Sequence, residues 1–164
     1  MAVMRVAGIS AAAALIWVAG ASQAPSHEKL VLRAIVPGAV ETQPFGCSSL
    51  VLEPFDPYCP SRHIHTGVDL AAPKGTAVRA AASGTAGVGF DPGGCGLYVS
   101  VSVDGHVRVL YCHLSAALVS PGDRVFTGEL LGRVGSTGLS TGAHLHFEVQ
   151  VDGRAVNPLL WLAS

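Results

Sequence analysis

Beyond Arg62 the sequence consists of short, mostly apolar segments that alternate as strands do and are separated by glycine. Such segments predict β-strands, and no stretch after the N-terminal apolar run keeps a helical apolar period over about ten residues. Asp-Gly pairs at 104–105 and 152–153 are flanked by strand-forming residues, which predicts two hairpins with positive φ in their turns. The sequence therefore predicts an all-β, antiparallel domain. The strand-like segments are TAVRAAASGTAGVGF (76–90), GLYVSVSV (96–103), HVRVLYCHL (106–114), DRVFTGELLGRVG (123–135) and HLHFEVQV (144–151).

The length and charge of the chain narrow its possible functions. With 164 residues it has room for one hydrophobic core, and therefore for one main site. Its formal net charge is -1 and only 13% of its residues are charged, so it lacks the basic stripe with which nucleic-acid binders neutralise phosphates. We expect no nucleic-acid partner and a monomeric protein.

The N-terminal residues have the layout of a secretory signal peptide. Arg5 precedes an uncharged apolar stretch at residues 6–21, which ends in an Ala-x-Ala site at 19–21. The alternative is an uncleaved membrane anchor through residues 6–21, although this stretch is short for a full span. In both cases the rest of the chain is exported, to the periplasm, the cell envelope or the extracellular space. We therefore assign residues 1–24 to a signal peptide or anchor.

Four cysteines suit an exported protein, because thiols oxidise to disulfides outside the cytoplasm. None forms a Cys-x-x-Cys pair, which argues against a thiolate zinc site. Four cysteines permit three pairings; we favour Cys47 with Cys59 and Cys95 with Cys112, and free thiols are the alternative. The first pair closes a covering loop within residues 25–62, which also hold the apolar run LVLRAIV, interpreted as an entry strand.

Two of the seven histidines, His144 and His146, lie one residue apart in the last long strand-like segment. Residues two apart on a strand point to one face, with Cα atoms roughly 6 to 7 Å apart, so both imidazoles can reach one metal ion and its bound water. Glu148 shares this face, and we favour an ordinary exposed glutamate over a partner of the histidines. The other face carries the expected core residues Leu145, Phe147 and Val149.

A second metal-binding signal lies upstream in HTGVDL, where His65 precedes Asp69 by four positions. Gly67 and the β-branched residues between them disfavour a helix. A fully extended strand holds the two side chains too far apart to share an ion, so we expect a bend at Gly67. Imidazole and carboxylate are ordinary zinc ligands, and two histidines with one carboxylate leave a fourth position open for water, as in catalytic zinc sites.

In combination these residues resemble the lysostaphin-like zinc endopeptidases, also called the LytM type, which cut peptidoglycan peptides. The resemblance covers about residues 63 to 160 in the order of the family. Ala143 stands where the family usually has proline, and Cys95 and Cys112 replace residues that are more often aromatic or small. The matching stretches are HTGVDLAAPKGTAVRAAASGTAGVG, GLYVSVSV, LYCHLS, VSPGDRVFTGELLGRVGSTGLSTGAHLHFEV and VDGRAVNP.

The resemblance implies a fold, a cofactor and an activity for residues 63–164. The fold is a compact antiparallel β-sandwich or barrel-like domain of the LytM, duplicated-hybrid-motif type, with a groove that carries the metal. The activity is hydrolysis of amide bonds in peptidoglycan peptides, cross-bridge or stem, by metal-activated water. By position, the resemblance implies one Zn²⁺ per chain held by His65, Asp69 and His146, with His113 and His144 as the catalytic histidines.

Two expectations concern the surroundings of this site. His63 lies near the first motif but has no aspartate four residues later, so we interpret it as a bystander. The irregular segments 40–62 and 89–96 are within sequence reach of the ligands, and we expect them to wall the groove.

Three other interpretations compete with a peptidase. One is a non-catalytic domain of the same fold that binds cell wall or activates a hydrolase, but such domains usually lose ligands. A second is a lipoyl- or biotin-carrying module, which SPGDRVFTGELLGRVG also resembles; neither Lys29 nor Lys74 lies at a suitable hairpin tip. A third is a cupin or carbonic-anhydrase-like metal site, and neither the spacing of Glu148 nor the chain length suits it.

Overall fold

A computed structural model describes residues 34–162 of the chain. The predicted signal peptide or anchor, residues 1–24, lies outside the described residues, and within them no helix has the length and apolar character to cross a membrane. The chain ends in a short helix, α2 (Pro158–Leu162). The strands are β1 (Val40–Gln43), β2 (Gly46–Ser48), β3 (His63–His65), β4 (Val68–Ala71), β5 (Ala77–Arg79), β6 (Gly84–Asp91), β7 (Gly96–Ser102), β8 (Val107–Cys112), β9 (Leu114–Ala117), β10 (Arg124–Val125), β11 (Leu130–Val134), β12 (His144–Val151) and β13 (Arg154–Val156).

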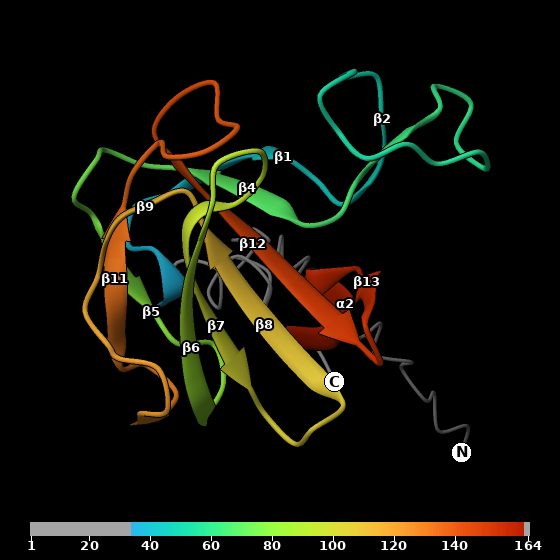
Figure 1. Cartoon of the computed structure of the whole chain (residues 1–164). Coiled ribbons are helices and arrows are strands. Elements are labelled where there is room, and N and C mark those ends of the chain that lie inside the picture. The colour runs from blue at the N-terminus through green and yellow to red at the C-terminus, as the bar shows by residue number, and fades with distance from the viewer. Residues whose placement is uncertain (1–33, 163–164) are drawn as a thin grey trace, which may run out of the picture.

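The described strands form three sheets, and every pairing between them is antiparallel. The large sheet has the order β1-β4-β12-β8-β7-β6-β10, with β13 added beside β12. A smaller sheet, β5-β11-β9, lies beside it on the left of Figure 1, and β2 pairs only with β3. The prediction of an all-β, antiparallel domain is confirmed.

The two predicted hairpins differ in their turns. Between β12 and β13, Asp152 and Gly153 have φ of 49° and 76°, so both central residues are left-handed as expected. Between β7 and β8 only Gly105 has a positive φ, of 86°. There the Asp104 carboxylate accepts the backbone N–H groups of His106 and Val107, which makes a longer loop.

The core lies where the inner faces of the sheets meet, and β12 crosses its centre. Leu145, Phe147 and Val149 are fully buried, as their alternation with the histidines predicted. Phe147 packs on Tyr111 of β8 with ring centroids 5.5 Å apart. The Tyr111 hydroxyl accepts the Ala81 N–H at 2.8 Å, so the buried polar end of this side chain is used.

The predicted entry strand is wrong in its described part. Ala34 and Ile35 are helical, the rest of LVLRAIV up to residue 33 lies outside the described residues, and the first described strand begins at Val40. Ile35 and Val36 are nonetheless buried in the core. The described end of the apolar run therefore buries its hydrophobic side chains in the core from a turn, without pairing as a strand.

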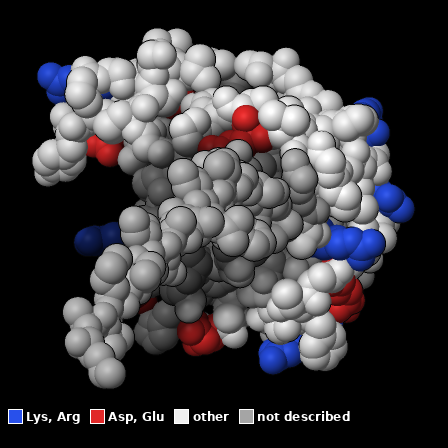
Figure 2. Space-filling view, turned by 180° about the vertical axis from the view of Figure 1, so that it is seen from behind, with Lys and Arg blue, Asp and Glu red and all other residues white. Residues whose placement is uncertain are grey.

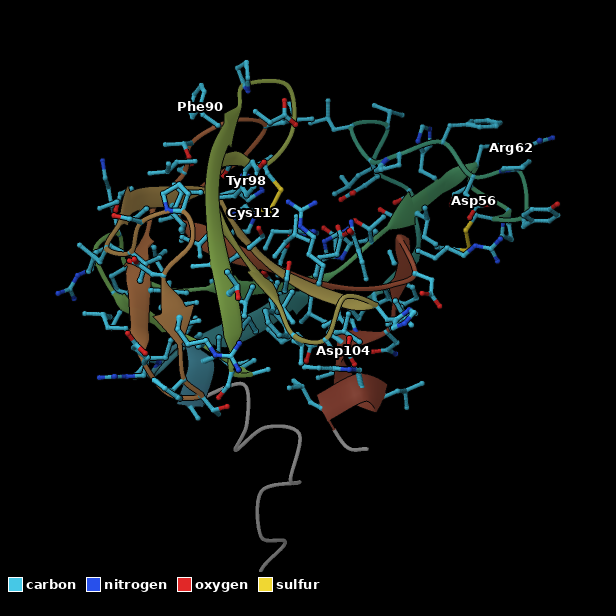
Figure 3. All side chains as sticks on the ribbon, turned by 60° about the horizontal axis from the view of Figure 1, so that its bottom comes forward. Asp56, Arg62, Phe90, Tyr98, Asp104 and Cys112 are labelled. Carbon is cyan, nitrogen blue, oxygen red and sulfur yellow. A yellow bond between two sulfur atoms is a disulfide. The ribbon has the colours of Figure 1, made fainter. Side chains whose placement is uncertain are left out.

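Residues 46–65, which we call the arm, project from the body of the domain at the upper right of Figure 1. The arm consists of β2, β3 and the loop between them, which a disulfide from Cys47 to Cys59 closes. A second disulfide joins Cys95 to Cys112 beside the large sheet (Figure 3). Both predicted pairings are confirmed, and no described cysteine is free.

Charged side chains are dispersed over the face of the molecule that Figure 2 shows. On the face shown in Figure 2, Lys and Arg side chains lie scattered around the rim and do not gather into a stripe.

Candidate active site

The register of the large sheet brings the predicted site residues together. On one side of β12, His146 pairs with Asp69 of β4, and on the other side it pairs with Cys112, the residue before His113. His65 ends β3, and the chain bends at Gly67 before β4 begins, as the sequence predicted. Segments far apart in the sequence thus deliver their side chains to one place.

Three of these side chains place one donor atom each at the corners of a nearly equilateral triangle. His65 Nε2 lies 3.1 Å from Asp69 Oδ1 and 3.0 Å from His146 Nδ1. His146 Nδ1 lies 3.0 Å from the same Asp69 oxygen. Ligands about 2.0–2.2 Å from a tetrahedral metal are separated by roughly 3.3–3.6 Å. The three donor atoms lie a few tenths of an ångström closer together than that, and two imidazoles with one carboxylate are a donor set that could hold a metal ion.

The second nitrogen of the His65 ring shows which of its atoms is free to bind. Its Nδ1 lies 2.9 Å from the Pro44 carbonyl oxygen, which can only accept a hydrogen bond. Nδ1 therefore carries the hydrogen, and Nε2 presents a lone pair to the triangle. Hydrogen bonds of this kind orient histidine ligands in metal sites.

His113 and His144 lie beside the triangle with ring centroids 4.7 Å apart. His113 donates its Nδ1–H to the Thr137 carbonyl at 2.8 Å, which leaves its Nε2 unprotonated. His144 donates its Nδ1–H to the Gly142 carbonyl at 2.9 Å, and its Nε2 lies 3.6 Å from Asp69 Oδ2. All five predicted side chains therefore line one groove.

His63 does not join this cluster, although it lies only two residues from His65. Its Nδ1 lies 2.8 Å from the Glu53 carbonyl, and its ring packs edge-on against Phe55 in the arm. Residues two apart on a strand share a face, yet the His63 ring contacts the loop of the arm while the His65 ring reaches the triangle. These contacts agree with the interpretation of His63 as a bystander.

The backbone of His113 adopts an unusual conformation. Its φ is 63°, in the left-handed region that few residues other than glycine, asparagine and aspartate occupy easily. Its N–H donates to the Cys95 carbonyl at 2.7 Å, and the neighbouring Cys112 is disulfide-bonded to Cys95. These two links to the loop before β7 hold the His113 side chain toward the groove. The disulfide was predicted from the sequence, whereas the left-handed backbone of His113 was not.

Burial and mutual hydrogen bonds shift the pKa values of several side chains in this cluster. Burial acts to raise the pKa of Asp69, but hydrogen bonds from His146 and His65 outweigh it and hold this pKa well below its usual value. Burial acts to lower the pKa of His146, but its bonds to Asp69 and Glu148 outweigh it and raise this pKa to about 9. Burial lowers the pKa of His113 to about 4, helped by the nearby His144 and His146, so this imidazole is neutral at pH 7.

Glu148 is buried, so the expectation of an ordinary exposed glutamate is wrong. Its exposed fraction is 8%, and its Oε2 accepts the Thr66 hydroxyl at 2.6 Å and lies 3.4 Å from His146 Nε2. Gln150 donates to Oε1 at 2.5 Å. Burial acts to raise the pKa of Glu148, but the hydrogen bonds of His146, Thr66 and Gln150 outweigh it and lower this pKa. The sequence signal available for this burial was the position of Glu148 itself, two residues after His146 and on the same face of the strand.

The site lies in a groove of about 400 Å³. As predicted, the arm and the loop before β7 form two of its walls, through residues that include Leu50, Leu52 and Gly94. A third wall, Leu139, Ser140 and Thr141, was not predicted. The Gly/Ser/Thr-rich run GSTGLSTG just before His144 is the sequence signal that indicated a loop at this point.

Known proteins are similar to this chain in sequence and in fold. The profile of Peptidase family M23 matches residues 63–158. The DD-carboxypeptidase/endopeptidase Mpg of Neisseria meningitidis is 48% identical over 96 residues, or 58% of this chain and 22% of the relative. The peptidoglycan DD-endopeptidase ShyA of Vibrio cholerae is 38% identical over 95 residues, again 58% of this chain and 22% of the relative.

A solved structure extends the similarity to three dimensions. The catalytic domain of the antimicrobial peptidase lysostaphin from Staphylococcus simulans superposes with a TM-score of 0.66 at 29% identity, covering 84% of this chain and 98% of that domain. The chain thus matches nearly a whole catalytic domain, but it spans only about a fifth of the length of the two curated relatives.

Proposed function

The chain belongs to peptidase family M23, and from this premise we propose that it is a zinc-dependent endopeptidase that hydrolyses amide bonds in peptidoglycan peptides. The observation that carries the proposal is the triangle of His65 Nε2, Asp69 Oδ1 and His146 Nδ1, with sides of 3.0 to 3.1 Å. Three protein ligands with an open fourth position are typical of catalytic zinc sites, whereas structural sites are closed by four.

The peptidoglycan substrate is supported by the relatives rather than by the triangle. Mpg and ShyA carry the names of enzymes that cut D,D-peptide bonds, and ShyA is named for peptidoglycan itself. Because peptidoglycan lies outside the cytoplasm, this substrate agrees with an exported protein held by two disulfides.

Bound zinc in such a site polarises a scissile carbonyl and lowers the pKa of a water molecule. The chain's own residues handle the protons. His113 is neutral with an unprotonated Nε2, so it is suited to accept a proton from the attacking water and pass it to the leaving amine. His144, whose Nε2 lies 3.6 Å from the Asp69 carboxylate beside the triangle, is placed to stabilise the oxyanion.

The experiment separates metal binding from turnover. Zinc content and cleavage of purified peptidoglycan are measured for wild type, His146→Ala and His113→Asn. Asparagine is the better replacement at position 113 because it tolerates the left-handed φ of 63°. We expect His146→Ala to lose zinc and activity, and His113→Asn to keep zinc while its turnover falls about 10² to 10⁴-fold.

Two results contradict the proposal. A wild-type protein that binds no zinc, or that binds zinc but releases no muropeptides detectable by mass spectrometry, favours the non-catalytic alternative. A His113→Asn variant with wild-type turnover removes His113 from the mechanism.

A further inference from the structure

The two ring nitrogens of His146 face different partners. Nδ1 faces the triangle, 3.0 Å from both His65 Nε2 and Asp69 Oδ1. Nε2 lies on the opposite edge of the ring, 3.4 Å from Glu148 Oε2. An imidazole that binds a metal through one nitrogen carries its hydrogen on the other, and the partner of that hydrogen sets the orientation and basicity of the ring.

Glu148 is itself held in place by the bend between β3 and β4. Thr66 donates its hydroxyl to Glu148 Oε2, the same oxygen that faces His146. Among the described residues no Lys or Arg pairs with this buried carboxylate, and its ion pair there is with His146. A buried carboxylate is costly unless it is paired and hydrogen-bonded, and here Thr66, Gln150 and the His146 ring supply its partners.

The segment from His65 to Asp69 therefore surrounds His146. His65 and Asp69 supply two corners of the triangle, and Thr66 anchors the carboxylate behind the ring. Gly67 allows the ring to pass close to the backbone, since a Cβ there lies 2.8 Å from two of its atoms. One short bend thus contacts both edges of the same imidazole.

We propose that Glu148, anchored by Thr66, is a positioning residue that holds the hydrogen of His146 on Nε2 and so directs Nδ1 toward the metal. Glu148 is not itself a ligand, because it lies beyond the ring on the side away from His65 and Asp69. This inference rests on the proposed zinc site. Loss of such a partner typically weakens metal affinity by about 10 to 100-fold.

The test measures zinc affinity of the full protein by competition with a chromophoric chelator at pH 7. Glu148→Gln keeps the shape of the side chain and removes its charge, and Thr66→Val keeps the shape and removes the anchoring hydroxyl. We expect the zinc Kd to rise about 10-fold or more in Glu148→Gln, and by a smaller factor in Thr66→Val. Because both act through the same carboxylate, the double variant is expected to equal Glu148→Gln alone.

Glu53→Gln is the matched control, because Glu53 lines the same groove but its side chain bonds to Gln43; its contact with His63 is through the backbone carbonyl, which the substitution keeps. We expect its zinc Kd to equal that of wild type. Two further measurements separate positioning from folding. The thermal midpoint of the metal-free protein should change little in Thr66→Val, and nitrogen NMR of the zinc-loaded wild type should show His146 protonated at Nε2, with faster solvent exchange of that proton in Glu148→Gln.

The inference is overturned if the zinc Kd of Glu148→Gln and of Thr66→Val is within twofold of that of wild type while His146→Ala no longer binds zinc. The zinc site then exists but does not depend on Glu148 or Thr66. If His146→Ala instead keeps wild-type affinity, the proposed zinc site itself fails. If Glu148→Gln does not fold, the test depends on Thr66→Val, whose site is only half-buried. An unchanged zinc Kd in that variant overturns the inference.

Discussion

Replacement of Gly67 by alanine tests whether the bend between β3 and β4 must admit the His146 ring. A Cβ at this position lies 2.5 Å from the Phe147 carbonyl oxygen and 2.8 Å from Cε1 and Nε2 of His146, whereas ordinary contact begins at 3.4 Å. The φ of Gly67 is not in the left-handed region, so the effect of alanine comes from contact alone.

The size of the effect follows from these distances. To restore ordinary contact the ring must move by about 0.6 Å, in a close-packed region where the Phe147 side chain beneath it is fully buried. Metal–ligand distances tolerate only about 0.2 Å. We therefore expect the zinc Kd to rise about 10 to 100-fold. Overpacking of this kind also lowers the free energy of unfolding by about 1–3 kcal/mol.

The assay combines chelator competition for zinc with urea unfolding of the metal-free protein. Gly93→Ala is the control, because Gly93 also lines the groove but a Cβ there comes no nearer than 3.8 Å to another atom. A Gly67→Ala protein with the zinc Kd and the unfolding midpoint of wild type refutes the close approach on which this reasoning depends.

Three further predictions follow from the fold and the site. Burial raises the pKa of Tyr111 above its usual value of about 10, so stability is present below pH 10 and is lost as the pH rises above it, when only the unfolded state ionises. In urea unfolding, Tyr111→Phe should be less stable than wild type by about 1–3 kcal/mol at pH 8, because Ala81 N–H loses its acceptor. That gap should shrink by about 1.4 kcal/mol per pH unit above 10; a constant gap contradicts the assignment. Replacing Cys95 and Cys112 together by alanine should lower stability by about 3 kcal/mol, since the disulfide spans 17 residues, and should lower kcat while zinc affinity persists. Unchanged kcat shows that the disulfide does not hold His113. Finally, dialysis against a chelator should lower the thermal midpoint, and zinc at about 100 times its Kd should restore about 2.7 kcal/mol of stability. Calorimetric scans that show no shift between the dialysed and the zinc-loaded protein contradict a native zinc site.

The local sequence was sufficient to predict the strand at residues 144–151 and the face of that strand on which His144 and His146 lie. Alternation along residues 144–151 separates His144 and His146 from the core side chains, and this depends only on the two-residue period of a strand. The same reasoning underlies the hairpin at Asp152–Gly153, where two positive φ values are confirmed. The two disulfide pairings were also predicted, because the first closes a loop and the second joins two nearby strands.

The same alternation was not sufficient to predict that Glu148 is buried. It places Glu148 on the histidine face, but its burial depends on Thr66, which arrives from the bend after β3. The entry strand failed for a related reason: the apolar residues Ile35 and Val36 do pack in the core, yet the sequence alone does not state whether a short buried run packs as a strand or a turn.

By itself the sequence determined the residue types available for a metal site and the direction in which each strand presents them, because both are properties of neighbouring residues. Only the tertiary structure decided that His146 pairs with Asp69 in the sheet, that three donor atoms lie 3.0 to 3.1 Å apart, and that His113 turns into the groove through a left-handed backbone. Strand register and loop closure join residues up to 82 positions apart, and no local period encodes such distances.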